Sequence, residues 1–171
     1  MLILSEQEIQ RLYTMEEAIS DVKEILRQKQ AGNVNTPERT VLSFPHYDAS
    51  ILYMPSVKTG AAAVKVVSIF PHNPPLGKPT TQGVIILTDT KTEEHRMLCN
   101  ATYLTRLRTG ALSAIAADYL AKREASRLAV IGTGAMAREQ VAGMLEVRGI
   151  EHIFLYNRTR SKAERFALEG W

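Results

Sequence analysis

The stretch Leu128–Ala137, which reads LAVIGTGAMA, decides the fold of the C-terminal part of this 171-residue chain. An apolar run ends at Ile131, and a Gly-x-Gly-x-x-Ala turn follows from Gly132 through Gly134 to Ala137. In such a turn the first glycine permits a tight bend, and the second lets the backbone approach a pyrophosphate. The small third residue lets the next helix pack closely on the sheet. The stretch therefore predicts the start of a dinucleotide-binding unit, which would hold a nicotinamide cofactor.

The residues after this turn support a dinucleotide-binding unit. The alternative is a glycine turn that binds no ligand. A helix is expected over 135–147, a second strand over 152–156 and a further helix from Ser161. This β-α-β order is typical of a parallel, doubly wound sheet. A complete fold of this kind uses about six parallel strands, and this stretch supplies two. We therefore expect a fragment or an interrupted reading frame.

The end of the second expected strand bears on the choice of cofactor. An acidic residue there would bind the ribose 2′-hydroxyl of NAD, but the sequence has Asn157, Arg158 and Thr159 after Tyr156. The Arg158 guanidinium suits a 2′-phosphate, with Asn157 and Thr159 as neutral hydrogen-bond donors. The position favours NADP(H) over NAD(H), and the alternative is that Arg158 is a solvated loop residue.

Residues 1–121 show a different pattern. Ser5 with Glu8 and Thr14 with Glu17 have the spacing of capping boxes, and apolar residues recur at helical spacing from Met15 to Leu26. Segments with strand character follow at 40–44, 51–54, 62–70, 84–88 and 96–99, and a helix is expected over 102–121. The charged residues 122–127 mark a boundary. We expect an α+β domain over 1–121 and an incomplete Rossmann-type nucleotide-binding portion over 122–171.

Three basic residues of the N-terminal part are candidates for ligand binding. Lys65 lies in an almost wholly apolar strand, where an unpaired ammonium is costly, so it needs a partner or ligand unless it points to water from a half-exposed sheet. Arg108 is spaced from Leu104 and Ala111 on the stripe that should face inward, where an arginine usually meets a carboxylate or phosphate. Arg39 opens a strand and is unremarkable by itself.

Composition excludes several classes of protein. The 45% apolar and 23% charged fractions are those of a globular protein, and no apolar run approaches the roughly 20 residues needed to span a bilayer. A single cysteine, Cys99, and an N-terminus without signal-peptide features indicate the cytoplasm. The four histidines lack the spacing of metal ligands, so no metal is expected.

The formal net charge of +3 is concentrated in residues 122–171, which carry nine basic and six acidic side chains. These charges are scattered and lack interleaved aromatic residues, so no nucleic-acid partner is expected. Two explanations of this positive charge are open. It creates an electrostatic field suited to a phosphate-bearing cofactor, or it belongs to an ordinary solvated surface.

Together these segments resemble the ornithine cyclodeaminase/mu-crystallin family. The matching stretches are 54–55, 64–66, 77–83, 104–114, 131–135 and 156–159. The resemblance implies an N-terminal domain that binds substrate and forms a homodimer, followed by a nucleotide domain. Its members include ornithine cyclodeaminase, alanine dehydrogenase and reductases of cyclic ketimines such as pyrroline-2-carboxylate. The shared chemistry is hydride exchange between a nicotinamide and the α-carbon of a small amino or imino acid.

By position, the resemblance assigns Arg39, Lys65 and Arg108 to the substrate carboxylate, with Lys65 also exchanging a proton near the reacting nitrogen. The cofactor contacts that it implies, together with the turn itself, are Thr80, Arg108, Gly132, Thr133, Gly134, Ala135, Met136, Ala137, Asn157, Arg158 and Thr159. The family's catalytic aspartate lies in a later part of the nucleotide domain than this chain reaches. Two hypotheses follow: the N-terminal portion of an enzyme, or an inactive remnant that only dimerises or binds small carboxylates.

Overall fold

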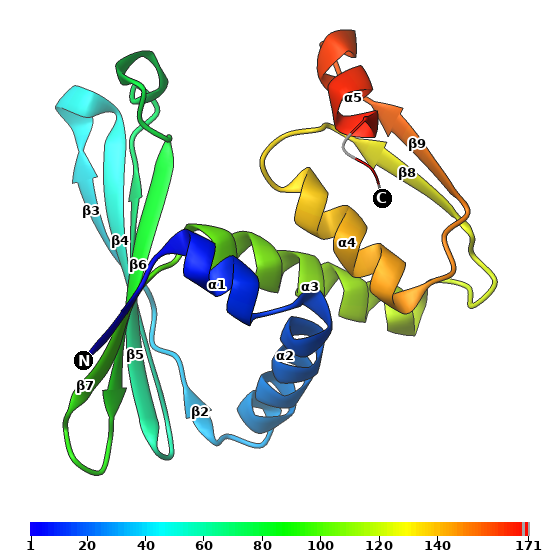
Figure 1. Ribbon diagram of the computed structural model, residues 1–171. Coiled ribbons are helices and arrows are strands. Elements are labelled where there is room, and N and C mark those ends of the chain that lie inside the picture. The colour runs from blue at the N-terminus through cyan, green and yellow to red at the C-terminus, as the bar shows by residue number, and fades with distance from the viewer. Residues whose placement is uncertain (169, 171) are drawn as a thin grey trace. The chain divides into compact units, whose positions relative to one another are not determined.

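The computed structural model describes residues 1–168 and 170 (Figure 1). The chain divides into two compact units, one of Met1–Leu12 with Ile25–Leu104, the other of Tyr13–Glu24 with Thr105–Trp171. The expected domain boundary between residues 121 and 122 stays a prediction, because compact contact units need not coincide with folding domains. The fold class expected from the sequence, an N-terminal α+β portion followed by a truncated Rossmann-type portion, is confirmed.

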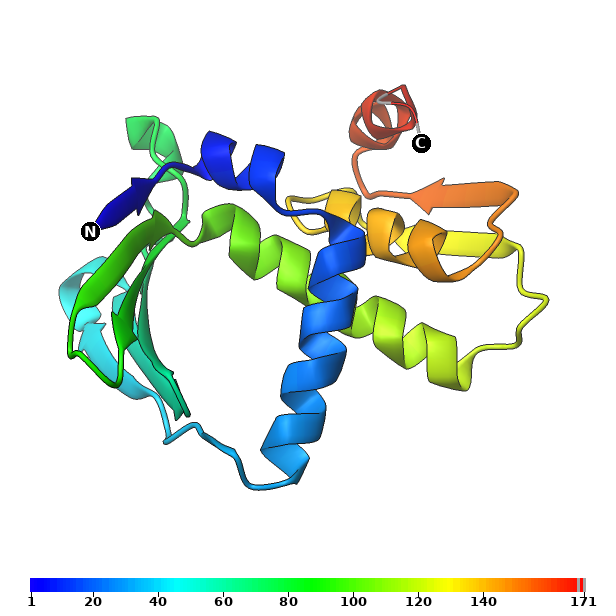
Figure 2. The same cartoon turned by 60° about the horizontal axis from the view of Figure 1, so that its bottom comes forward.

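The first unit is built on a seven-stranded sheet in the order β1-β7-β6-β5-β4-β2, with β3 also paired to β4. Its strands are β1 (Leu2–Leu4), β2 (Val34–Asn35), β3 (Thr40–Phe44), β4 (Ala49–Lys58), β5 (Ala61–Ile69), β6 (Thr81–Asp89) and β7 (His95–Asn100). Short 3₁₀ turns, η1 (Pro45–Tyr47) and η2 (Pro74–Leu76), lie between strands. All pairs are antiparallel except β1 with β7. Figure 2 shows that the sheet curves. The five expected strands are all present.

The two faces of this sheet differ in exposure. Cross-strand partners lie on the same face, and successive residues alternate between faces. One face carries Leu52, Val67 and Cys99, all buried. The other, which we call the open face, carries the exposed apolar residues Ile3, Leu42, Tyr53, Val57 and Val84, each between 37% and 65% exposed. Leu2 and Val41, at the edges of the first face, are also exposed, so the difference between the faces lies mainly in the middle of the sheet.

Both expected capping boxes are confirmed. At α1 (Glu6–Leu12) the Ser5 N–H donates to Glu8 Oε2 at 2.8 Å, and the Glu8 N–H donates to Ser5 Oγ at 3.3 Å. At α2 (Met15–Gln30) Thr14 and Glu17 make the same reciprocal pair. These bonds satisfy backbone donors that a helix start leaves open. No helix in the described part of the chain has the length and apolarity that a bilayer crossing requires.

The second unit contains a β-α-β arrangement. Strands β8 (Arg127–Ile131) and β9 (His152–Tyr156) pair in parallel, connected by α4 (Ala137–Val147), and α5 (Arg160–Ala167) follows. Ala137, Val141 and Phe166 form the buried core, against which apolar residues of both strands pack. The helix α4 begins two residues later than expected, because the glycine turn extends through Met136.

A close contact joins α4 to α3 (Thr102–Leu120) within this unit. A Cβ added at Gly110 would clash with the Glu139 carbonyl oxygen, and one added at Gly143 would lie 2.7 Å from the Gly110 carbonyl oxygen and 3.1 Å from the Ala114 Cβ. The backbones of the two helices therefore meet with no intervening side chain at positions 110 and 143. Neither glycine has a left-handed backbone conformation, so packing alone requires them.

Arg148, which follows α4, closes the C-terminal end of α3. Its guanidinium donates to the carbonyl oxygens of Ala117, Asp118 and Ala121 at 2.8–3.1 Å and pairs with the Asp118 carboxylate at 3.0 Å. Lys23 Nζ also contacts that carboxylate, at 3.1 Å. Hydrogen bonds from Arg148 and then Lys23 hold the pKa of Asp118 below its ordinary value. One buried side chain thus caps two carbonyls of the last turn of α3 and the carbonyl that follows the helix.

We expect Gly143→Ala to lower the free energy of unfolding by about 1–3 kcal/mol, because the added methyl must push apart two backbones. Gly149→Ala is the control, since a Cβ there meets nothing within 4 Å; it should change stability by less than about 0.5 kcal/mol. Urea unfolding followed by circular dichroism measures both. Equal effects of the two substitutions would contradict the close helix contact.

The lowered pKa of Asp118 gives its ion pairs a predictable pH dependence. The folded-state pKa lies below the unfolded value of about 3.9, so the stabilisation is complete above that value and disappears as the pH falls through the folded pKa. We expect Asp118→Asn to lower the melting temperature at pH 7, with a difference that shrinks below about pH 4. Glu146→Gln removes a similar charge from an exposed position and should show no such pH trend. A constant difference across this range would refute the assignment.

Candidate functional site

The glycine turn between β8 and α4 has the geometry that the sequence predicts. Gly132 has a φ of 94°, which is a left-handed conformation, and its N–H donates to the Tyr156 carbonyl at 2.7 Å. The Ala137 N–H donates to the Gly134 carbonyl at 3.0 Å, and Ala137 is buried in the core. The first glycine therefore makes the bend and the small third residue permits close packing, as expected.

Gly134 tests whether the turn fits a dinucleotide. Its backbone is not left-handed, and a Cβ added there would meet nothing within 4 Å. Neither conformation nor packing of the described chain therefore requires glycine at this position. A phosphate group approaching the backbone and the start of α4 would require it, because a side chain would occupy its path.

Asn157 has a role that its spacing did not predict. Its Oδ1 accepts from the Thr133 N–H at 3.2 Å, and its Nδ2 donates to the Thr159 carbonyl at 2.8 Å. The side chain thus fastens the end of β9 to the glycine turn. An aspartate could accept the first of these bonds but could not donate the second. We interpret Asn157 first as a positioning residue, with one further N–H to offer a ligand.

A pocket of about 500 Å³ lies beside this turn. It is lined by Thr133, Gly134, Ala135, Arg138, Lys162, Arg165 and Phe166. Among the described residues, the Thr133 Oγ1 is buried without a hydrogen-bond partner. The lining contains three cationic side chains and, among described residues, no acidic one. The arrangement therefore suits an anionic ligand.

Sequence reasoning named three of these lining residues and missed the cations. Thr133, Gly134 and Ala135 were expected as cofactor contacts, whereas Arg138, Lys162 and Arg165 were not. The spacing of Lys162 and Arg165, three residues apart on α5, is the signal that was available. Three of the nine basic residues in the C-terminal part thus gather at the turn.

Arg108 does not face inward, as its spacing had suggested. The buried residues of α3 are Leu107, Gly110, Ala111, Ala114 and Ile115, and Arg108 is exposed. Each helical residue turns by about 100°, so Arg108 lies at the edge of the buried stripe, on the side of Ile115. Ala111 of the expected stripe is buried, but the expected inward position of Arg108 was wrong. Arg108 projects from the same helix that Gly110 holds against α4.

Within the first unit, Arg39 and Lys65 lie at the same cross-strand position of the sheet. Arg39 lies one residue beyond the pair of Thr40 with Tyr53, so it is level with Met54, the cross-strand partner of Lys65. Lys65 is half-buried and shares its face with Val67, the buried side of the sheet. Its strand therefore directs it away from the open face.

Thr80 lies elsewhere in that unit. It precedes β6, and its carbonyl accepts from the Phe70 N–H at 2.8 Å. Phe70 is five residues along the chain from Lys65, which is about 17 Å at strand spacing. Within the unit, the structure thus groups Arg39 with Lys65 and separates Thr80 from both.

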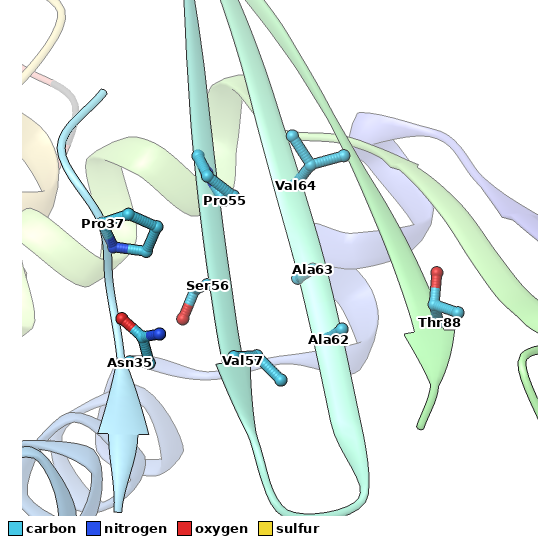
Figure 3. A pocket seen from close by; sticks show the side chains of 9 residues that line it. All are labelled: Asn35, Pro37, Pro55, Ser56, Val57, Ala62, Ala63, Val64 and Thr88. Carbon is cyan, nitrogen blue, oxygen red and sulfur yellow. The ribbon is translucent and has the colours of Figure 1, made fainter. Parts of the chain in front are cut away.

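A second pocket, of about 290 Å³, lies on the sheet of the first unit (Figure 3). Its lining is Asn35, Pro37, Pro55, Ser56, Val57, Ala62, Ala63, Val64 and Thr88. No charged side chain is among these described residues, so the pocket offers little for chemistry. Among the described residues, no group of three or more His, Cys, Asp or Glu side chains is placed to hold a metal ion. The glycine turn with its cationic pocket is therefore the candidate functional site.

Known proteins resemble this chain in fold and in sequence. The chain is 41% identical over 169 residues to a Delta(1)-pyrroline-2-carboxylate reductase of Bacillus cereus, covering 98% of the chain and 52% of that protein. The structure of Thermococcus litoralis Delta(1)-pyrroline-2-carboxylate reductase in complex with NADH and L-proline superposes with a TM-score of 0.93 at 37% identity, over 99% of this chain and 53% of that one.

An archaeal alanine dehydrogenase dimer with bound NAD gives a TM-score of 0.93 at 33% identity, over 98% of this chain and 52% of that one. The chain thus spans about half the length of these relatives. Residues 1–170 match the family described as the ornithine cyclodeaminase/mu-crystallin family. This match covers all but one residue, and the chain belongs to that family.

Proposed function

We propose that the chain is the N-terminal portion of a cytoplasmic enzyme that transfers a hydride between a nicotinamide dinucleotide and the α-carbon of a small amino or imino acid. The observation that carries the proposal is the glycine turn before α4, where a Cβ at Gly134 would meet nothing within 4 Å and the path of an approaching phosphate is open. The reductase and dehydrogenase names of the relatives support this reaction class. The single cysteine, buried in the first unit, fits a reducing compartment.

The residues of this chain would bind and orient the reactants. The backbone N–H groups of Ala135 and Met136, which directly precede α4, would hold the pyrophosphate. When bound, the dinucleotide supplies or accepts the hydride. Arg39, Lys65 and Arg108 would hold the substrate carboxylate, and Lys65 would exchange a proton at the substrate nitrogen.

We further propose a preference for NADP(H) over NAD(H). The loop after β9 has no acid for a ribose 2′-hydroxyl and presents Arg158 and Thr159 instead. Arg158 is exposed and can approach a 2′-phosphate from solvent. The Thermococcus relative was solved in complex with NADH.

The competing hypothesis is an inactive remnant. The chain spans about half the length of its relatives, and the family resemblance implies a catalytic aspartate outside this half. A remnant could still dimerise or bind small carboxylates without turning them over.

Binding and turnover by the purified chain test the proposal. We expect NADPH to bind, as measured by nicotinamide fluorescence, and its absorbance to fall on addition of pyrroline-2-carboxylate if this portion suffices for turnover. Gly134→Val should weaken nucleotide binding by at least about tenfold, because the side chain would block the phosphate. Gly149→Val is the matched control at a glycine remote from the turn in sequence, also without a neighbour within 4 Å. Binding without turnover would favour the remnant, and no binding of either nucleotide would contradict the proposed function.

We also propose that the chain forms a homodimer through the open face of its sheet. Monomeric proteins rarely expose a contiguous apolar patch of this kind. Tyr53 of β4 and Val84 of β6 lie in one row across this patch, because both pair with Val66 of β5. The dimeric state of the archaeal alanine dehydrogenase supports a second copy as the occupant.

Light scattering after size-exclusion chromatography tests this assembly. The unaltered chain should have the mass of a dimer. Tyr53→Glu and Val84→Glu should each shift it to a monomer, because a buried unpaired carboxylate is costly. Thr92→Glu adds the same charge in an exposed turn and should leave the dimer unchanged. A monomeric unaltered chain, or a dimer insensitive to both open-face substitutions, would refute the proposal.

A further inference from the structure

We propose that the uncovered side of the β8–β9 sheet is a docking surface for a separate polypeptide, one that carries further strands and helices of a parallel nucleotide-binding sheet. Two chains would then assemble one nucleotide site. The docking surface stands on the fold of this unit, and the nucleotide site of the assembly rests on the proposed function.

The two sides of this two-stranded sheet differ in cover. Paired residues of the two strands share a side, and successive residues of each strand alternate between sides. The side chains that pack against the core of α4 and α5 are Leu128, Val130, Ile153 and Leu155. Those of the other side, which we call the outer side, are all exposed, and they are Arg127, Ala129, Ile131, His152, Phe154 and Tyr156.

The outer side is apolar over most of its length. Ile131 and Tyr156 are neighbours across the strand pair and are 83% and 67% exposed. Phe154, 56% exposed, lies two residues before Tyr156 and therefore on the same side. Arg127 and His152 give the patch a polar border where the two strands begin. A contiguous apolar patch with a polar border is typical of a site of association.

The edges of this sheet are open as well. In the described part of the chain, β8 and β9 pair only with each other, so the outer edge of each strand presents unpaired backbone N–H and C=O groups. Proline and charged residues commonly block such edges. Neither strand contains proline, and Arg127, the first residue of β8, is the one Lys, Arg, Asp or Glu in the pair. Further strands can therefore be added at both edges.

The kind of sheet determines which occupant fits. Parallel sheets are covered on both faces, a doubly wound sheet has about six strands, and a two-stranded sheet is marginal by itself. The missing cover is therefore a set of parallel strands with helices for the outer side. The reductase and dehydrogenase relatives have nearly as much chain outside the match as within it, which is enough for such a set.

A second copy of this chain fits less well. A copy related by a two-fold axis would present the same two strands, and an edge paired with itself across such an axis is antiparallel. The outer side would then receive another sheet in place of the helices that cover parallel strands. We therefore assign the outer side to a different polypeptide.

The docking surface is formed before its partner arrives. Nearly all of this chain superposes on the Thermococcus reductase, although that chain is almost twice as long. The backbone around β8 and β9 thus needs no rearrangement to receive the remaining part. Association of preorganised surfaces avoids the free-energy cost of ordering, which favours binding in trans.

Joint production with the missing half of a relative tests the docking surface. The probe is the segment of the Bacillus cereus reductase that lies outside its 169-residue match, produced together with this chain carrying an affinity tag. We expect the segment to be recovered with the chain in a 1:1 complex, measured by light scattering. Phe154→Glu and Tyr156→Glu should each reduce this recovery at least about tenfold, because a carboxylate would be buried without a partner.

The matched control is Tyr47→Glu, which makes the same exchange in the turn before β4 at 65% exposure, close to that of Tyr156. It should leave recovery unchanged. Because the altered side chains are exposed in the chain alone, all three variants should keep its melting temperature. The matched half of the Bacillus cereus reductase, produced with the same segment, is the positive control.

Each other outcome overturns the proposal. Recovery with the matched Bacillus half but not with this chain would show that the surface is not a docking site, and recovery with neither would exclude assembly from two chains. Recovery that is insensitive to both substitutions would place the contact elsewhere, and a homodimer that Tyr156→Glu disrupts would assign the outer side to a second copy. A 1:1 complex that binds neither NADPH nor NADH would contradict the proposed function and leave the docking surface intact.

Discussion

The carbonyl oxygen of Glu139 fills the space where any side chain at position 110 would place its Cβ. This contact, repeated at Gly143, brings the backbones of α3 and α4 together without intervening side chains. The helix α4 begins at the glycine turn, and α3 carries Arg108, so two candidate binding elements belong to one tightly packed block. Arg148 strengthens the block by satisfying the last carbonyls of α3 from the far end of α4. The spacing between the turn and Arg108 is thus set by helix packing, not by a flexible loop.

The packing of α3 on α4 also places a positive charge beside the acidic residue in the first turn of α4. Glu139 lies in the first turn of that helix, where a carboxylate is favourable to the helix but would repel an anion bound at the turn. Arg106 of α3 contacts its carboxylate at 3.0 Å, and both side chains are largely shielded from water. The close approach at Gly110, four residues after Arg106, places that guanidinium beside Glu139. The pair neutralises the nearest negative charge, so the cations that line the turn face an anion without opposition from Glu139.

The local sequence signals predicted most of this arrangement, and the failures have physical causes. Capping boxes and the glycine turn depend on neighbouring residues, so both were found. The strands β1 and β2 were missed because two or three residues are too few to show alternation. The burial of Arg108 was predicted wrongly because this residue lies at the edge of the buried stripe of α3, where spacing alone does not determine whether a long side chain is exposed. Lys162 and Arg165 were missed because their direction depends on how Phe166 packs, which is a tertiary contact.

Successive side chains of β5 point to opposite faces of the first unit's sheet, so Lys65 and the open face lie on different sides. In β5, Lys65 and Val67 point to the buried side, while Val64 and Val66 point to the open face. Arg39 and Lys65 flank Met54 of β4, one on each side of this strand. Two of the proposed carboxylate contacts can therefore converge on the buried side. A second copy on the open face would therefore cover neighbours of Lys65 in sequence without touching Lys65 itself. The proposed association on the open face would therefore be compatible with a ligand at Lys65 on the other face of the same strand.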